Sequence, residues 1–145
     1  MDIDRDYLIQ PLSQRVYGDF VYWLSIIASL FCAVAPVIAV TSPGRNIINP
    51  HYLFSAIWEG MEPSAIWQAV GSGFPGGHFW LNHLTYGDGL AGFGLALGCY
   101  SAVVALLATA VTHIMKQPRS FGWALASIAI ATLITLAATG VYQQA

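Results

Sequence analysis

Three long apolar stretches separate the charged positions of the chain and predict its main elements. No Asp, Glu, Lys or Arg occurs at 20–44, 89–115 or 120–145, so each uncharged stretch is 25 to 27 residues long. A bilayer core about 30 Å thick is crossed by roughly 20 helical residues. The sequence therefore predicts an all-α membrane protein with three transmembrane helices, at 18–40, 89–115 and 121–142.

The segments between the predicted helices indicate a topology. They are an N-terminal segment 1–17, a loop 41–88, a turn 116–120 and a tail 143–145. Cytoplasmic segments of membrane proteins are enriched in Lys and Arg. Four of the five basic residues fall in the N-terminal segment and the turn, namely Arg5, Arg15, Lys116 and Arg119. We therefore expect the N-terminus and the turn to lie in the cytoplasm, and the loop and the C-terminus to lie outside.

Composition narrows the class of protein. The 145 residues are 57% hydrophobic and 8% charged, with a net charge of −2, whereas soluble domains carry about 25% charged residues. This balance excludes an ordinary soluble protein, and the lack of a basic patch excludes nucleic acid as a partner. No ionisable residue lies in the middle of a predicted span, which argues against a transporter or pump acting alone. Because no nucleophile is paired with a base in the sequence, we expect no catalytic activity from the chain alone.

Small residues recur at every fourth position of the second predicted helix, at Gly94, Gly98 and Ala102. This spacing lets helix backbones approach closely in lipid, and the third predicted helix is rich in Ala and Thr. The five-residue turn 116–120 makes these two helices antiparallel neighbours. Two interpretations follow: the helical hairpin packs on itself, or one small-residue face receives a larger partner subunit.

The loop 41–88 has 48 residues, which is too many for a passive connection. It contains two similar pieces, Ser55–Glu59 and Ser64–Gln68, which we interpret as short helical turns that each carry a Trp. A segment that is rich in aromatic side chains and carries little charge favours helices in the membrane interface, or a cap docked on an extracytoplasmic partner. The candidate residues for interfacial or partner contact are Trp58, Trp67, Phe74, Trp80 and Asp88.

Asp88 lies at the start of the second predicted helix, next to His78 and His83. These three residues lack a fourth ligand, so we expect no metal site. Asp88 is instead predicted to be the N-cap of the helix, because a carboxylate there accepts backbone N–H groups at the positive end of the helix dipole. The alternative is a role beside a quinone or a partner.

Two histidines flank the second predicted helix, His83 before it and His113 near its end. Imidazole is a common protein ligand of haem, but the two residues are thirty positions apart, about 45 Å along a helix, and cannot bind one haem. Either can supply one ligand to a haem b shared with another subunit, or line a quinone site. The simpler interpretations are an interfacial polar residue for His83 and an imidazole at the negative end of the helix dipole for His113.

Gly, Pro and aromatic residues form a recognisable pattern between 49 and 140. Its members are Asn49-Pro50, Trp58, Phe74-Pro75-Gly76-Gly77, Trp80-Leu81, Leu84, Gly87-Asp88, Gly94–Leu97, Cys99-Tyr100 and Ala137–Gly140. In these residues the chain resembles a group of small three-span bacterial membrane proteins of unassigned function, which are encoded near multihaem cytochromes and other respiratory modules. The resemblance implies a bacterial cytoplasmic membrane and a role as an accessory subunit in electron transfer. It brings no catalytic residues.

Together these patterns lead us to expect an accessory, structural subunit of a multi-subunit membrane redox complex. It would brace larger membrane subunits and contact an extracytoplasmic cytochrome and the lipid bilayer. The alternative is a cofactor-bearing subunit, in which His83 or His113 contributes to a haem b or a quinone site. Two further alternatives are a pigment-protein accessory subunit, whose histidine would ligate a chlorin magnesium, and a transporter component.

Overall fold

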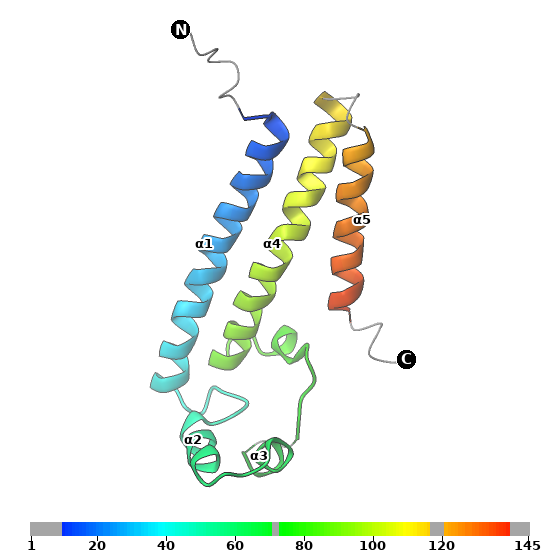
Figure 1. Cartoon of the computed structure of the whole chain (residues 1–145). Helices are drawn as coiled ribbons and strands as arrows, with labels where there is room; N and C mark the ends of the chain where they lie inside the picture. Colours follow the sequence, from blue (N-terminus) through cyan, green and yellow to red (C-terminus); the bar gives the residue numbers. More distant parts are fainter. Residues whose placement is uncertain (1–9, 71–72, 117–120, 140–145) are drawn as a thin grey trace, which may run out of the picture. The chain divides into compact units, whose positions relative to one another are not determined.

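The protein, seen here in a computed structural model, is described at residues 10–70, 73–116 and 121–139, and all regular structure in these ranges is helical. The helices follow one another along the chain as shown in Figure 1. In order they are α1 Leu12–Thr41, α2 Pro50–Trp58, α3 Pro63–Val70, the short 3₁₀ helix η2 Phe79–Asn82, α4 Gly87–Lys116 and α5 Phe121–Ala138.

Three of these helices, α1, α4 and α5, are long and apolar enough to cross a membrane. They match the three predicted stretches, but two of them are longer than expected. α1 begins at Leu12, six residues before the predicted start at 18, and the carbonyl of Pro11 accepts the N–H groups of Gln14 and Arg15 in its first turn. The prediction used uncharged stretches, which mark the bilayer core, and a helix can continue beyond that core into polar residues.

The ends of α4 and α5 also differ from the prediction. α4 starts at Gly87 rather than 89 and ends at Lys116 rather than 115. α5 is helical to Ala138, and the last residues of the predicted third span, 140–142, lie outside the described residues.

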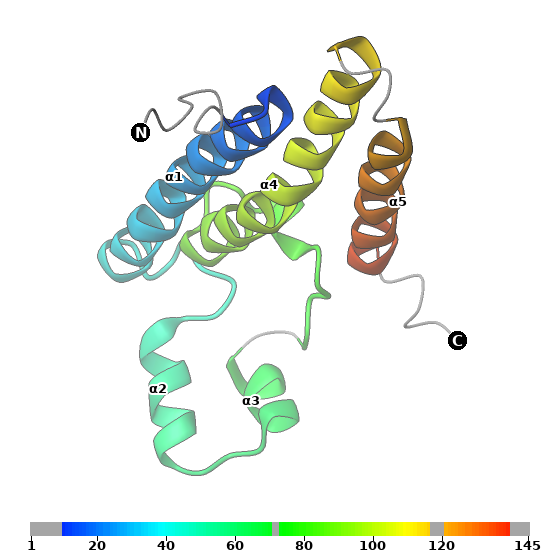
Figure 2. The same ribbon diagram turned by 45° about the horizontal axis from the view of Figure 1, so that its top comes forward.

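The chain divides into two compact units. The first combines residues 1–25 with 98–145 and holds the beginning of α1, the C-terminal part of α4 and all of α5. Figures 1 and 2 both show α5 alongside α4 and running in the opposite direction, the arrangement that the short turn 116–120 predicts. The buried side chains described in this unit are small or of medium size: Ser13, Ser101, Val103, Ala105, Thr109, Ala110, Ala124 and Ala131.

The second unit comprises residues 26–97 and holds the rest of α1, the helices α2, α3 and η2, and the beginning of α4. Within it α2 packs against α3. The ring of Phe93 on α4 lies edge-on to Phe31 of α1, with centroids 5.0 Å apart, and contacts Trp80 of η2 at 5.9 Å. Phe93 therefore joins the two long helices to the segment between them.

The helix α2 has a clear start and a clear stop in the sequence. Asn49 is its N-cap, whose side chain accepts the N–H of His51, and Pro50 occupies the first turn, where no N–H is needed. At the other end Gly60 has a φ of +72°. Its N–H donates to the carbonyl of Ile57, and the N–H of Met61 donates to the carbonyl of Ala56. This is the Schellman arrangement, which glycine favours because the left-handed conformation strains other residues.

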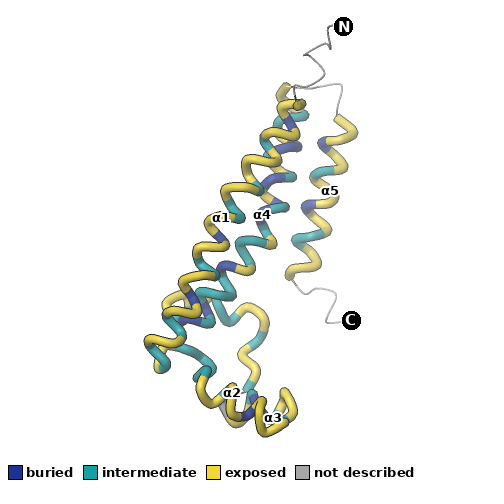
Figure 3. Tube along the Cα trace, turned by 60° about the vertical axis from the view of Figure 1, so that its left-hand side comes forward, coloured by how far each residue is buried: buried dark blue, intermediate teal, exposed yellow. Residues whose placement is uncertain are grey.

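Full burial along the three long helices is confined to residues no larger than Val, and many of the large apolar side chains are exposed. In the most apolar 18-residue stretch of each helix, 11% of the residues are buried in α1 and α5, and 22% are buried in α4. Figure 3 shows the buried positions as scattered dark segments along the helices. Examples of the exposed side chains are Trp23, Leu30, Leu95, Trp123 and Leu133, each more than half exposed. The described chain thus leaves wide apolar surfaces that none of its own residues cover.

Candidate functional site

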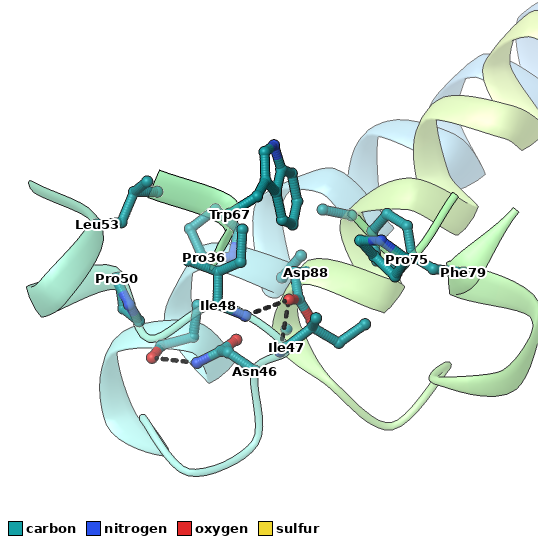
Figure 4. A pocket seen from close by; sticks show the side chains of 14 residues that line it. Pro36, Asn46, Ile47, Ile48, Pro50, Leu53, Trp67, Pro75, Phe79 and Asp88 are labelled. Carbon is teal, nitrogen blue, oxygen red and sulfur yellow. Dashed lines mark hydrogen bonds between the residues drawn. The ribbon is translucent and has the colours of Figure 1, made fainter. Parts of the chain in front are cut away.

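The carboxylate of Asp88 ties the start of α4 to the loop after α1. Its Oδ2 atom accepts the backbone N–H groups of Ile47 at 2.6 Å and Ile48 at 3.2 Å (Figure 4), and its Oδ1 atom accepts the N–H of Gly89 at 2.9 Å. The helix begins at Gly87, so its N-cap position is Tyr86 and the prediction of Asp88 as N-cap is wrong by two residues. Asp88 lies in the first turn, where a negative charge is favoured, and most of its bonds fix the loop rather than the helix.

Asn46 fastens the same loop to the end of α1. Its Nδ2 atom donates to the carbonyls of Ala39 at 3.0 Å and Pro43 at 3.4 Å, while its Oδ1 atom is buried without a hydrogen-bond partner. The amide of Gly87 donates to the carbonyl of Arg45 at 3.0 Å, and a Cβ at position 87 would lie only 2.6 Å from Asn46 Oδ1. Glycine is therefore required where α4 meets this loop. Asn46 could not be selected from the sequence, because one Asn in a loop does not indicate which carbonyls its side chain will bond.

A cavity of about 310 Å³ lies beside Asp88 and Asn46, at the low end of the range of about 300–1,000 Å³ found for small-molecule sites. We call it the Asp88 cavity. Figure 4 shows its wall, which is otherwise apolar and comes from the end of α1, the following loop, α2, α3, the segment before η2, η2 itself and the start of α4. The larger side chains in the wall are Pro36, Leu53, Trp67, Pro75 and Phe79. Because Asp88 is already engaged by backbone amides, this cavity suits an apolar group rather than a charged one.

His83 is held in a defined orientation at the end of η2. Its Nδ1 atom lies 2.9 Å from the carbonyl oxygen of Phe79, and its ring lies edge-on to Tyr86 at 5.1 Å. A carbonyl only accepts, so Nδ1 carries the hydrogen and Nε2 keeps its lone pair. Histidines that ligate haem or metals are commonly oriented by such a bond.

Within the described ranges, no group of three or more His, Cys, Asp or Glu side chains is placed to hold a metal ion. His78 is exposed at the start of η2 and does not join His83 and Asp88 in such a group. Any cofactor bound through His83 would therefore take its other ligands from elsewhere.

The glycines of α4 allow close approach on two sides. A Cβ at Gly94 would lie 2.7 Å from Sγ of Cys32 and 3.1 Å from the carbonyl oxygen of Ala28, both on α1. A Cβ at Gly92 would lie 2.9 Å from Cβ of Trp80. Of the two interpretations of the small-residue series, packing of the hairpin on itself is therefore wrong at Gly94, whose neighbour is α1.

The other two members of the small-residue series are half-buried. Gly98 and Ala102 lie in the first unit, and the carbonyl of Gly98 accepts the hydroxyl of Ser101 at 2.6 Å. Gly94 thus belongs to the second compact unit, and Gly98 and Ala102 belong to the first.

The aromatic residues predicted to contact the interface or a partner divide into two groups. Trp58 is 87% exposed and Phe74 is 66% exposed. Trp67 stacks edge-on against Phe74, with centroids 5.1 Å apart, and also lines the Asp88 cavity. Trp80 is half-buried between Gly92 and Phe93. Only Trp58 and Phe74 present most of their surface outward.

A second cavity, of about 620 Å³, lies in the first compact unit. We call it the His113 cavity. Each long helix contributes a pair of residues four positions apart, which face the same side of a helix: Ser13 and Tyr17 on α1, Thr109 and His113 on α4, Trp123 and Ser127 on α5. His113 and His83 belong to different compact units. The sequence singled out only His113 of this group, although the four-residue spacing of each pair was visible in it.

Comparisons with known proteins place the chain among relatives. A family model matches residues 13–141. One similar protein, an uncharacterized protein of Archaeoglobus fulgidus, is 33% identical over 111 residues, which cover 74% of this chain and 71% of the relative. A second uncharacterized protein of the same organism is 26% identical over 133 residues, which cover 92% of this chain and 91% of the relative. No solved structure matches the chain. Because the family model spans nearly all of the sequence and the first relative exceeds 30% identity, the chain belongs to this family.

Proposed function

We propose that the protein is an accessory integral-membrane subunit that braces larger subunits of a membrane redox complex. The observation that carries the proposal is the inverted pattern of burial on α1, α4 and α5: small side chains such as Ala105 and Ala124 are buried, while Leu30, Leu95 and Leu133 are exposed. Such surfaces are stable only against lipid or another apolar protein surface. A chain with this pattern is suited to lie between lipid and larger partners.

In this proposal the three long helices cross a prokaryotic cytoplasmic membrane, with the N-terminus inside. The excess of Lys and Arg before α1 and after α4 favours that orientation. The segment with α2 and α3 then lies outside, where the exposed rings of Trp58 and Phe74 suit the membrane interface or an extracytoplasmic cytochrome. The bacterial source was inferred from the sequence resemblance, and the relatives found are archaeal.

The redox context rests on the resemblance of residues 49–140 to small membrane proteins encoded near respiratory modules. One structural observation is compatible with a redox role, although it would also fit other roles of a histidine. His83 keeps Nε2 available as a ligand while Nδ1 is held by the carbonyl of Phe79. A second candidate function is therefore a subunit that gives one axial ligand to a haem b, with the remaining ligand from a partner.

The proposal is tested in the native host. A chromosomally tagged copy is purified in mild detergent, the co-purifying chains are identified by mass spectrometry, and the preparation is examined by a dithionite-reduced minus oxidised spectrum. We expect redox subunits to co-purify, and we expect deletion of this chain to lower the amount of that assembled complex on a native gel. Recovery of the chain alone, together with unchanged redox complexes in the deletion strain, would contradict the proposal.

The same preparation separates the two candidates. In His83→Ala protein the accessory role predicts an unchanged difference spectrum and an unchanged complex. Loss of a haem b band from a complex that stays assembled would favour the cofactor-bearing role. His78→Ala is the matched control, because His78 is a nearby exposed histidine whose side chain makes no capping hydrogen bond to η2.

A further inference from the structure

The His113 cavity gathers polar groups at one end of three apolar helices. Ser13 lies in the first turn of α1, His113 in the last turn of α4 and Trp123 in the first turn of α5. These are the helix ends beside the basic residues Arg15 and Lys116. If the helices cross a bilayer, this end meets the headgroup region, where the polar part of an amphiphile lies.

The hydrogen-bonding capacity of the cavity is only partly used. The hydroxyls of Thr109 and Ser127 donate to the carbonyls of Ala105 at 2.7 Å and Trp123 at 2.9 Å, so their hydrogens are engaged. The hydroxyl groups of Ser13 and Tyr17 make no hydrogen bond within the described ranges. Each of these two hydroxyls can donate one hydrogen bond, so the cavity can bind an uncharged ligand that carries hydrogen-bond acceptors.

His113 adds the least satisfied group. Its Nδ1 atom is buried without a hydrogen-bond partner. Nδ1 has almost no accessible surface, so an occupant of the cavity cannot bond to it. An unpartnered buried acceptor costs less than an unpartnered buried N–H, which places the imidazole hydrogen on Nε2 and leaves that atom as the donor of the ring.

Charge and shape narrow the class of occupant. The described lining residues carry no formal charge, so the cavity offers no strong partner to a phosphate or carboxylate. The rings of Tyr17 and Trp123 supply flat apolar surfaces that suit an aromatic ring. A volume of about 620 Å³ lies within the range of small-molecule sites.

We infer that the His113 cavity binds the head group of an isoprenoid quinone, an uncharged ring with carbonyl acceptors and an apolar tail. One carbonyl oxygen accepts from His113, the hydroxyls of Ser13 and Tyr17 supply further donors, and the tail extends into the bilayer. The use of such a site rests on the proposed function, since a redox complex is where quinone would be exchanged. The inference concerns binding and includes no electron-transfer step.

The test uses the purified full chain in nanodiscs of zwitterionic phosphatidylcholine. Decylubiquinone and 2,3-dimethyl-1,4-naphthoquinone are the probes, and quenching of Trp fluorescence is the signal. We expect saturable quenching by at least one probe, and loss of most of it in Trp123→Phe protein. His113→Phe should weaken binding about tenfold, and Tyr17→Phe about fivefold, as losses of single hydrogen bonds. His113→Asn, which keeps an N–H donor, should bind better than His113→Phe.

Two control variants give the experiment its specificity. His78→Phe changes an exposed histidine outside the cavity and should bind as the unchanged protein does. Arg15→Gln combined with Lys116→Gln removes nearby positive charge and should also have no effect. Circular dichroism checks that every variant keeps its helicity.

Three results would overturn the inference. The first is no saturable quenching by either probe, and the second is equal weakening by His78→Phe and His113→Phe. The third is displacement of the probe by phosphatidylglycerol with loss of binding in the double Arg15 and Lys116 variant, which would identify an anionic-lipid site. Because the assay uses the isolated chain, failure of quinone binding is distinguishable from failure to co-purify with a redox complex.

Discussion

Replacing Gly94 by Ala is expected to destabilise the protein, although alanine is the better helix former. The added Cβ would lie 2.7 Å from Sγ of Cys32, 3.1 Å from the carbonyl oxygen of Ala28 and 3.1 Å from the backbone nitrogen of Cys32. Non-bonded heavy atoms prefer about 3.5–4.0 Å. Two of the three atoms belong to the backbone of α1, so only the sulfur can move aside by rotation of its own side chain.

The expected magnitude follows from two opposing terms. Alanine in a helix interior is favoured over glycine by up to about 1 kcal/mol, whereas an extra carbon in a well-packed contact costs about 1–3 kcal/mol. We therefore expect a net loss of up to about 2 kcal/mol. For a chain of this size a loss of about 2 kcal/mol corresponds to a melting temperature lower by roughly 4–8 °C.

A matched control isolates the contact from helix propensity. Gly18 also lies inside a long helix, but a Cβ there meets nothing within 4 Å. Gly18→Ala should therefore leave the melting temperature unchanged or raise it by a few degrees. The assay is thermal loss of helicity, followed by circular dichroism in mild detergent.

A double variant tests which contact is responsible. Combining Gly94→Ala with Cys32→Ala removes the closest atom but leaves the two backbone contacts, so about half of the loss should be recovered relative to Cys32→Ala alone. If Gly94→Ala melts at or above the temperature of the unchanged protein, the close approach of α1 and α4 at this point is refuted. Equal destabilisation by Gly18→Ala would show that the effect does not come from this packing.

Three further predictions concern the segment between α1 and α4. Asp88→Ala removes the acceptor of three backbone amides and should lower the stability of this segment by about 2–4 kcal/mol. Asp88→Asn keeps one oxygen and should lower it less. The rate of proteolysis of the loop measures both variants, and equal losses of stability would contradict the role given to these hydrogen bonds. Gly60→Ala should weaken the end of α2 by about 1 kcal/mol because φ is +72°, and Gly77→Ala, with open space around it, should not; hydrogen exchange compares them. Trp58→Ala should change the stability of the isolated chain by less than about 0.5 kcal/mol because the side chain is 87% exposed; a larger shift in melting temperature would mean that the ring is buried.

The long helices were predictable because the bilayer imposes a simple condition on charge. A run without Asp, Glu, Lys or Arg of bilayer length is visible in the sequence, and α1, α4 and α5 coincide with the three such runs. The ends were less predictable, since a helix can continue into polar residues. α1 therefore reaches back to Leu12, through Arg15 and Asp19.

The contacts between segments of the folded chain were not predictable in the same way. A small residue at position 94 indicates a close approach, but not which helix approaches, and the structure assigns α1. Asp88 bonds amides 40 and 41 positions earlier in the sequence. Asn46 bonds carbonyls three and seven positions earlier, in a loop without a regular pattern, so the roles of both residues appear only once the chain is folded. The pairs Ser13–Tyr17 and Thr109–His113 could have been read as single helix faces, but nothing local shows that the faces belong to one cavity.

The distribution of glycine explains how such a chain can hold its helices together without a core of large side chains. Inside a bilayer the lipid is as apolar as the side chains, so hydrophobic burial does not drive helices together, and close packing and hydrogen bonds must do so. In the unit of residues 26–97, Gly87 and Gly94 let α4 approach the backbone of α1, while Gly89 and Gly92 admit His83 and Trp80. Asp88 adds hydrogen bonds to the loop at the same helix end. Many large apolar side chains, such as Leu30 and Leu95, can therefore stay exposed without weakening these internal contacts.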